Sequence, residues 1–446
     1  MVKRRAPARL PTLLASVLMA IAVVGCTAAA SPGGSPALAP SMTPSPSLTA
    51  ASPTDTAPTP SATATAATPS PTATAFPSPP PVIDPPSAKP WTRIEWVHGA
   101  GGVPVGPANV TAFGWSGGFV AVSSSGGEHD VGTDPFAIVA TGSPDGLRWS
   151  APMALDVSGL DGRVQAADLV EGPAGLLLVG YVDSGTCGGP NWVGALWSSS
   201  DGVAWTRIPL PKSLSSNRVE TLDAGAAGYI ATGLRKDGVT AGIWFSKTGA
   251  SWRSLALPIV STGIVVVNGA TSFDGGLVLA GAVLGPEGCG GAASVHPSLW
   301  WSKDGATWTR ESFTGGSSAR DATMTIRRLS DHAVIAIEES SKLDGLVAWV
   351  STDGRTWQRA GSPPRTIKWS LHTDGRHAVE VVSVEGTGAA IVAAVDERAR
   401  VTELEQAGDG PVASADPVPW TAALGPTGVL ILSVDGRSVW LGVPKG

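Results

Sequence analysis

The chain has 446 residues, a formal net charge of −6 and a charged fraction of only 15 %. Lysine and arginine form no cluster beyond the first nine residues, which argues against nucleic acid as a partner. A chain of this length is long enough for two to four domains, but a closed repeat architecture can place about 350 residues in one unit.

The N-terminus is predicted to be an export signal over residues 1–25. A basic segment within the first nine residues precedes an apolar run from Leu13 to Val24, which is too short for a comfortable membrane span. The run ends in Val-Val-Gly-Cys26, which resembles the lipobox of bacterial lipoproteins. The resemblance implies lipidation of Cys26 and anchoring at the outer face of the bacterial cytoplasmic membrane or at a periplasmic membrane face. The alternative is an ordinary signal peptide with a chance cysteine.

Residues 26–89 are predicted to be a disordered stalk. The segment consists mainly of alanine, proline, serine and threonine, so it has too little bulky apolar surface to offset the entropy of ordering. Its prolines favour extended polyproline II conformations, which would lift the following domain away from the membrane.

Five related heptapeptides follow, each with a serine first and a tryptophan last. Successive tryptophans lie 56, 47, 56 and 49 residues apart, a repeat length that suits a four-stranded propeller blade. An aspartate or threonine and a glycine at the centre predict a tight turn between two strands. The heptapeptides are SPDGLRW (143–149), SSDGVAW (199–205), SKTGASW (246–252), SKDGATW (302–308) and STDGRTW (351–357).

Each unit carries further strand signals ahead of its turn. A second tryptophan precedes the last one by eight residues in four units, as Trp197 precedes Trp205, and a glycine-led apolar run such as 174–181 lies upstream. Such nearly continuous apolar runs are typical of strands covered on both faces. The predicted blades cover 108–153, 163–210, 218–257, 263–313 and 321–361, then a degenerate one over 375–410 and a partial one from Trp420.

The partial unit at the C-terminus lacks an outer strand. The sequence Trp91-Thr92-Arg93-Ile94 is identical to the predicted outer-strand sequence that starts at Trp205, so we expect the N-terminal strand to complete the last blade. The sequence thus predicts an all-β fold over 90–446, a single closed β-propeller of four-stranded blades. Seven blades are favoured, and six is the alternative if the degenerate segment is an insertion.

The heptapeptides resemble the Asp-box, or BNR, repeats of sialidase-like β-propellers. The resemblance covers roughly residues 91–446, and it implies that the box turns join third and fourth strands on the face opposite a binding or catalytic site. Thr248 replaces the aspartate in the third copy. A structural role is expected for the box residues Asp145, Trp149, Asp201, Trp205, Trp252, Asp304, Trp308, Asp353 and Trp357.

Candidate binding residues are predicted in the long loops between second and third strands, because such loops on a rigid scaffold tend to carry function. Glu128, His129 and Asp130 have side chains suited to a metal or to acid–base chemistry, but a solvated loop explains them as well. Trp192 suits stacking on a sugar or a partner protein, or packing over a disulfide. His296 lies in the corresponding segment of the fourth unit. No metal or cofactor is expected.

Two cysteines remain once Cys26 is assigned to the lipid. Cys187 and Cys289 lie at matching places in two repeats, and an exported protein folds in an oxidising setting, so a disulfide between two loops is favoured over two separate thiols.

The sequence favours a lipid-anchored, monomeric, cell-surface scaffold that binds a glycan or a protein and performs no chemistry. One alternative is a sialidase-like glycoside hydrolase or lyase. A sialidase needs an arginine triad and a tyrosine nucleophile, and this chain has only two tyrosines, Tyr181 and Tyr229, both in predicted apolar strands. A second alternative is an assembly factor for a membrane complex.

Overall fold

A computed structural model describes residues 91–445, with gaps at 106–108, 125–137, 161, 184–191, 226, 286–294, 314–321, 340–346, 361–367, 374–377, 384–389, 409, 412–419 and 434. The chain divides into two units, Met1–Ser78 and Pro79–Gly446, and the described residues all belong to the second. In this part of the chain the regular structure is almost entirely β, as the sequence predicts. No helix within these ranges is long and apolar enough to span a bilayer.

Six four-stranded antiparallel sheets follow one another along the chain, and we number them blades 1 to 6. Blade 1 contains β2 (Val110–Trp115), β3 (Gly118–Ser124), β4 (Ile138–Ser143) and β5 (Met153–Ala154). Blade 2 contains β6 (Arg163–Gly172), β7 (Gly175–Asp183), β8 (Trp192–Ser199) and β9 (Thr206–Arg207). Blade 3 contains β10 (Arg218–Gly225), β11 (Gly228–Leu234), β12 (Ala241–Ser246) and β13 (Arg253–Ser254), and the one-turn helix α2 (Lys212–Ser215) precedes it.

The other three blades repeat this order. Blade 4 contains β14 (Ile264–Phe273), β15 (Gly276–Leu284), β16 (Val295–Ser302) and β17 (Thr309–Glu311). Blade 5 contains β18 (Thr323–Ser330), β19 (Ala333–Glu339), β20 (Val347–Ser351) and β21 (Gln358–Arg359). Blade 6 contains β22 (Lys368–Thr373), β23 (Ala378–Ser383), β24 (Ala390–Val395) and β25 (Val401–Glu403), so it begins earlier than the predicted boundary at 375.

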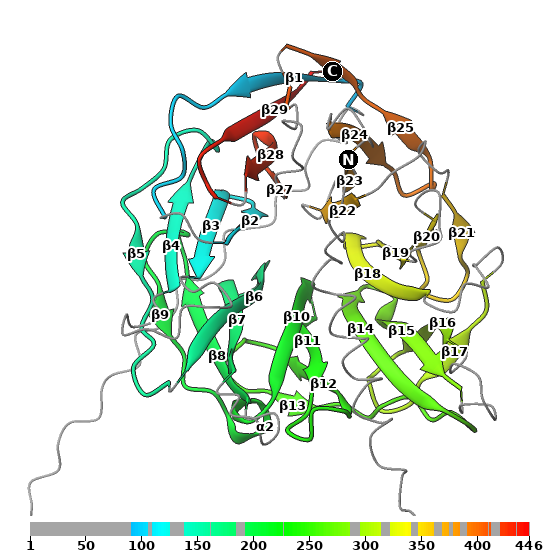
Figure 1. Cartoon of the computed structure of the whole chain (residues 1–446). Helices are drawn as coiled ribbons and strands as arrows, with labels where there is room; N and C mark the ends of the chain where they lie inside the picture. The colour runs from blue at the N-terminus through cyan, green and yellow to red at the C-terminus, as the bar shows by residue number, and fades with distance from the viewer. Residues whose placement is uncertain are drawn as a thin grey trace, which may run out of the picture. The chain divides into compact units, whose positions relative to one another are not determined.

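The first strands of the blades lie innermost. Each contacts the first strands of the blades before and after it, while the second, third and fourth strands follow outward in order, as Figure 1 shows. Because the strands alternate in direction, the turns after first and third strands share one face, which we call the box face. The connections after second strands and between blades share the other face, which we call the loop face.

In blades 1 to 4 the second strand opens with a glycine of positive φ, which the tight turn on the box face requires, whereas Ala333 and Ala378 open the second strands of blades 5 and 6. Gly118 has φ +143°, and a Cβ placed on it would come within 2.1 Å of the Ser143 carbonyl oxygen at the end of β4. The strand that follows is buried almost throughout, which explains its continuous apolar run.

Hydrophobic clusters join each sheet to the next. Trp197 and Trp205 share the cluster between blades 1 and 2, and Trp244 and Trp252 share the one between blades 2 and 3. Four tryptophans, one on the third strand of each of blades 2 to 5, are among the largest fully buried side chains: Trp197, Trp244, Trp300 and Trp349. The eight-residue spacing therefore places two indoles in one interblade cluster.

The remaining sheet has five strands in the order β26-β1-β29-β28-β27, and we call it the terminal sheet. It contains β27 (Trp420–Gly425), β28 (Gly428–Ser433), β29 (Val439–Lys445), the N-terminal β1 (Arg93–His98) and β26 (Glu405–Ala407). β1 pairs antiparallel with β29, from Arg93 opposite Lys445 to His98 opposite Trp440, and parallel with β26. One hydrophobic cluster joins this sheet to blade 6 and another joins it to blade 1.

Candidate functional site

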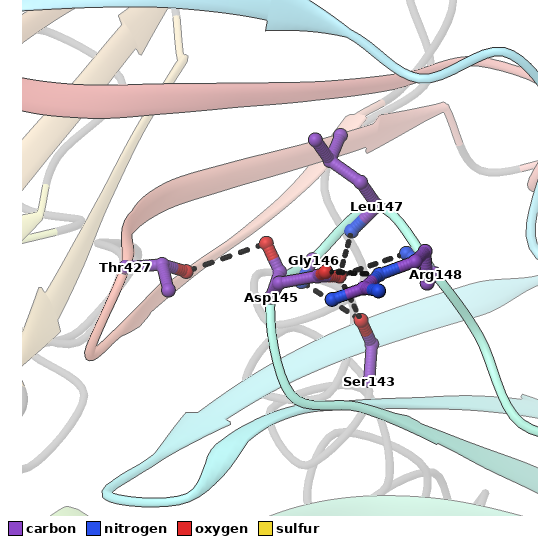
Figure 2. A network of polar contacts seen from close by, with 6 residues as sticks. All are labelled: Ser143, Asp145, Gly146, Leu147, Arg148 and Thr427. Atoms are coloured by element: carbon purple, nitrogen blue, oxygen red, sulfur yellow. Dashed lines mark hydrogen bonds and ion pairs between the residues drawn. The ribbon is translucent and has the colours of Figure 1, made fainter.

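The heptapeptide turns hold themselves together by local hydrogen bonds. Figure 2 shows the first one, where Asp145 Oδ1 accepts the backbone N–H groups of Leu147 and Arg148 at 3.0 and 2.8 Å, and the Gly146 N–H donates to Ser143 Oγ at 2.8 Å. Burial raises the pKa of Asp145, but these two N–H groups and the Arg148 guanidinium lower it to about 2. The Asp145 carboxylate thus forms its hydrogen bonds within its own turn, as a structural role requires.

The same bonds recur in the turns of Asp201 and Asp353, and in part in that of Asp304. In the third copy, Thr248 Oγ1 accepts only a long bond of 3.4 Å from the Ala250 N–H, although Gly249 keeps the same positive φ of +79°. The backbone turn therefore forms without the aspartate but with weaker side-chain support.

Two further turns of this kind were not singled out from the sequence. Asp237 accepts the N–H groups of Val239 and Thr240, and Asp435 accepts the N–H group of Arg437. Both connect second to third strands, so they lie on the loop face rather than the box face. The Asp-Gly pair in each is the signal that identifies them.

The predicted loop residues Glu128, His129 and Asp130 lie outside the described residues, as do Cys26, Cys187 and Cys289. Trp192 and His296 are described, and they lie at the loop-face ends of β8 and β16. Trp192 is partly buried and His296 is exposed. The structure therefore locates two of the five candidate binding residues, both on the loop face.

Trp192 belongs to a cluster built around an arginine that sequence reasoning missed. The Arg218 guanidinium, at the start of β10, lies 4.6 Å from the centre of the Tyr181 ring and 5.2 Å from that of Trp192. Tyr181 donates its hydroxyl to Gln165 Oε1 at 2.7 Å. Such cation–π contacts contribute about 0.5–2 kcal/mol each. The cluster spans blades 2 and 3 beside their innermost strands.

Glu220 completes this cluster from a β-bulge. The register of β10 against β11 shifts between Val219 and Thr221, which leaves Glu220 as the extra residue. Its Oε1 accepts from Arg218 Nη2 at 3.0 Å. Burial raises the pKa of Glu220 and the Arg218 charge opposes that rise. A partly buried ion pair whose arginine contacts two aromatic rings thus lies at the loop-face end of the inner strands.

A second group of charges lies deeper among the inner strands. Asp168 Oδ2 on β6 accepts the Leu222 N–H of β10 at 3.0 Å and lies 4.0 Å from Arg327 Nη2 of β18. Asp223 is 7 % exposed, and its Oδ1 accepts the Ala224 N–H. Burial raises the pKa of both carboxyls, against the charges of Arg327 and Arg328. These contacts link strands of blades 2, 3 and 5.

Tyr229 and Arg207 occupy structural positions. The Tyr229 hydroxyl accepts the Ala174 N–H at 2.9 Å and donates to the Gly175 carbonyl at 3.0 Å, while burial raises its pKa to about 12. Arg207 lies on the outer strand β9 and donates to the Ser158 carbonyl. It lines a cavity of about 460 Å³ at the outer edge of blade 2, together with Pro209.

No group of three or more metal-ligating side chains occurs in the part of the chain that the structure describes. The described site consists of an arginine that contacts two aromatic rings and has an acidic partner. Such an arrangement can bind an anionic or planar group by ion pairing and stacking.

The strand order, the innermost first strands and the interblade clusters define a β-propeller. No family model matches the sequence, and no curated protein does. Among solved structures, the chain is similar to a protein of unknown function from Dyadobacter fermentans, with 15 % identity, a TM-score of 0.40 and coverage of 79 % of this chain and 100 % of that one.

Two other solved structures are similar to a comparable degree. YCF48 bound to D1 peptide shares 14 % identity at a TM-score of 0.41, covering 80 % of this chain and 99 % of that one. Trypanosoma rangeli sialidase in complex with sialic acid shares 13 % identity at a TM-score of 0.39, covering 65 % of this chain and only 54 % of that one. The D1 peptide and sialic acid are ligands of those two proteins.

Proposed function

We propose that this protein is a lipid-anchored, cell-surface β-propeller that binds a glycan or a protein through its loop face and performs no chemistry. The observation that carries the proposal is the contact of the Arg218 guanidinium with the rings of Tyr181 and Trp192, with Glu220 on a bulge as its acidic partner. Aromatic side chains and arginine are the residues most enriched where binding energy is concentrated.

The tyrosines favour binding over catalysis. A tyrosine nucleophile must reach substrate and lose its proton, whereas the Tyr229 hydroxyl is buried and bonded on two sides. Tyr181 is 9 % exposed and contacts Arg218 with its ring, so it supports the arginine rather than an attack on substrate.

The test is to probe the full chain in detergent with a glycan array and with proteins from the producing cell surface. Ligand capture should fall at least tenfold in Trp192→Ala and Arg218→Ala. Arg355→Ala is the matched control, because Arg355 lies 4.7 Å from the centre of the Trp301 ring on the box face. Equal losses in all three variants would contradict a loop-face site.

A screen against sialosides and other glycosides tests the catalytic alternative. Turnover that disappears on changing Glu128 or Asp130 would replace the binding proposal with a hydrolase or lyase. Co-purification with an integral membrane complex would instead favour an assembly factor.

The lipid anchor is proposed from the segment that ends at Cys26. Cys26→Ser should release the protein from the membrane fraction, and continued membrane association of that variant would refute the anchor. For the proposed Cys187–Cys289 disulfide, the intact mass should rise on reduction by the mass of two hydrogen atoms, and two free thiols in the untreated protein would refute the disulfide.

We also propose that the terminal sheet serves as a seventh blade and closes the ring. The pairing of β1 with β29 supports this, as do the clusters that join the sheet to blades 6 and 1. Closure would remove the unpaired edges of an open array.

A further inference from the structure

The outer edge of β8 is left unpaired towards its loop-face end. β9 pairs with only two residues of β8, and the ladder ends where the Ile208 N–H donates to the Leu196 carbonyl oxygen at 2.8 Å. Pro209 follows, and a proline has no N–H to continue a ladder. Every second residue of a strand points its backbone groups to the same edge, so Gly194 is the next residue of β8 whose N–H and C=O point outward.

The outward groups of Gly194 lie at a cavity. Gly194 is buried, and no other described residue forms a hydrogen bond with its outward N–H or C=O. It lines the cavity of about 460 Å³ at the outer edge of blade 2, a volume within the about 300–1,000 Å³ typical of ligand pockets. A buried, unpaired backbone group costs free energy comparable to a lost hydrogen bond. The cavity therefore presents one donor and one acceptor that a bound molecule can satisfy.

The corresponding position is closed in blades 1, 3 and 4. It lies five residues before the serine of each heptapeptide. In blade 1 the Ile138 carbonyl accepts the Leu155 N–H at 2.9 Å, and in blade 3 the Ala241 carbonyl accepts Arg235 Nε at 3.3 Å. In blade 4 the position is Pro297, which lacks the N–H, as is common on strand edges that must not pair with another chain. Among these four blades, blade 2 leaves both groups open within the described residues.

The wall of the cavity selects its occupant. Asp156 and Arg207 contribute one negative and one positive charge, which balance each other, so a ligand without net charge is favoured. The described lining contains no aromatic ring on which a sugar can stack. Apolar side chains form much of the wall: Val193, Ala195, Ile208 and Leu210. An extended apolar peptide suits this wall, and its backbone N–H and C=O complement those of Gly194.

We infer that the open edge of β8 binds an extended, uncharged, apolar segment of a partner protein, which pairs with Gly194 as a short added strand. The site borders the Arg218 cluster, because Gly194 pairs with Tyr181 across β7 and β8. This inference rests on the proposed function, because it assumes a binding scaffold, and it names a peptide as the ligand of this edge.

The experiment selects random seven-residue peptides on the immobilised full chain in detergent. The selected peptides should be enriched in valine, isoleucine, leucine and alanine and poor in charged residues. The best peptide is then synthesised with an N-methyl group at each residue in turn. Methylation at one position should lower the affinity at least tenfold, because it removes the N–H that donates to the Gly194 carbonyl, while methylation at the two neighbouring residues should not. Equal affinities across the series, or selection of charged peptides, would overturn the inference.

Two variants at Gly194 form a matched pair. Gly194→Pro removes the N–H, as Pro297 does in blade 4, whereas Gly194→Ala keeps it. Both variants add a Cβ that lies 3.0 Å from the Leu214 carbonyl oxygen, so they share this contact. Affinity for the selected peptide should be at least tenfold lower in Gly194→Pro than in Gly194→Ala, with folding checked by circular dichroism, and equal affinities would contradict the inference. The N-methyl series uses the parent protein, so it decides the question even if the proline variant does not fold.

The remaining outcomes separate this inference from the proposed function. Selection of no peptide, together with a glycan whose binding is lost in Arg218→Ala, would leave the binding scaffold standing and make the edge inference wrong. Sedimentation of the parent as a dimer that is lost in Gly194→Pro would show that a second copy occupies the edge, and would also overturn the inference. If neither peptides nor glycans bind, both proposals are wrong.

Discussion

The third box turn offers a gain-of-stability test, because it alone among the five heptapeptides lacks the aspartate. We expect Thr248→Asp to stabilise the protein. The backbone is already in place, since Gly249 has φ +79° against +72° for Gly202 and +76° for Gly305. The new carboxylate would meet the N–H groups of Ala250 and Ser251 without rearrangement.

The magnitude follows from the matching turns. Thr248 Oγ1 accepts one bond of 3.4 Å, whereas Asp201 Oδ1 accepts two bonds of 2.8 Å and Asp353 Oδ1 accepts bonds of 2.7 and 2.6 Å. A hydrogen bond to a charged group contributes about 1.5–3 kcal/mol when shielded, and much less when exposed to water as here. A net gain of about 1 kcal/mol is therefore expected.

Urea unfolding of the full chain, followed by tryptophan fluorescence, measures this gain. For a folded unit of this size, about 1 kcal/mol raises the melting temperature by only about 1–2 °C, so the unfolding free energy is the better readout. Thr248→Asn is the control, because it keeps an acceptor oxygen without the charge, and it should gain less.

The gain should also depend on pH in a defined direction. The folded-state pKa of a box aspartate lies below its ordinary value, as for Asp145 and Asp201. Its stabilising contribution is therefore present above about pH 4 and disappears as pH falls through the folded-state pKa. A Thr248→Asp protein no more stable than the parent at pH 7, or equally stabilised at pH 2, would refute the reasoning.

Three further predictions concern the inner strands and the first box turn. Gly114→Ala should lower the free energy of unfolding by more than about 2 kcal/mol, because the new Cβ would lie 1.7 Å from the Leu424 carbonyl oxygen of the terminal sheet. Gly101→Ala is the control, since a Cβ there meets open space, and it should change the unfolding free energy little in the same urea assay. Asp145→Asn should lower the free energy of unfolding by about 1–2 kcal/mol at pH 7, because the variant loses the carboxylate that the turn stabilises. The difference in unfolding free energy between variant and parent should disappear as pH falls from about 4 through about 2. Burial raises the pKa of Asp223, so ionisation of this carboxyl destabilises the folded parent as pH rises above about 4. The unfolding free energy of Asp223→Asn relative to the parent should therefore increase over that range, and a difference in unfolding free energy that stays constant from about pH 3 to 8 would contradict this.

The amino-acid sequence by itself determined the hairpins. In four of the five heptapeptide turns the serine hydroxyl bonds to both the aspartate and the glycine N–H within three residues, so the turn geometry is encoded locally. The tryptophan spacing follows from the register of the hairpin. The start of blade 6 at Lys368 was predicted too late, because its second strand, β23, opens with Ala378 and lacks the glycine-led apolar run that marks the second strands of blades 1 to 4.

Tertiary structure alone decided which distant residues meet. Arg218 reaches Tyr181 and Trp192 because blades 2 and 3 pack side by side, and Arg327 approaches Asp168 because inner strands of separate blades converge. No local pattern marks these residues, since each is an ordinary strand residue in its own segment. Their association depends on the apolar faces of the sheets, whose burial sets the distances at which side chains from different blades contact one another.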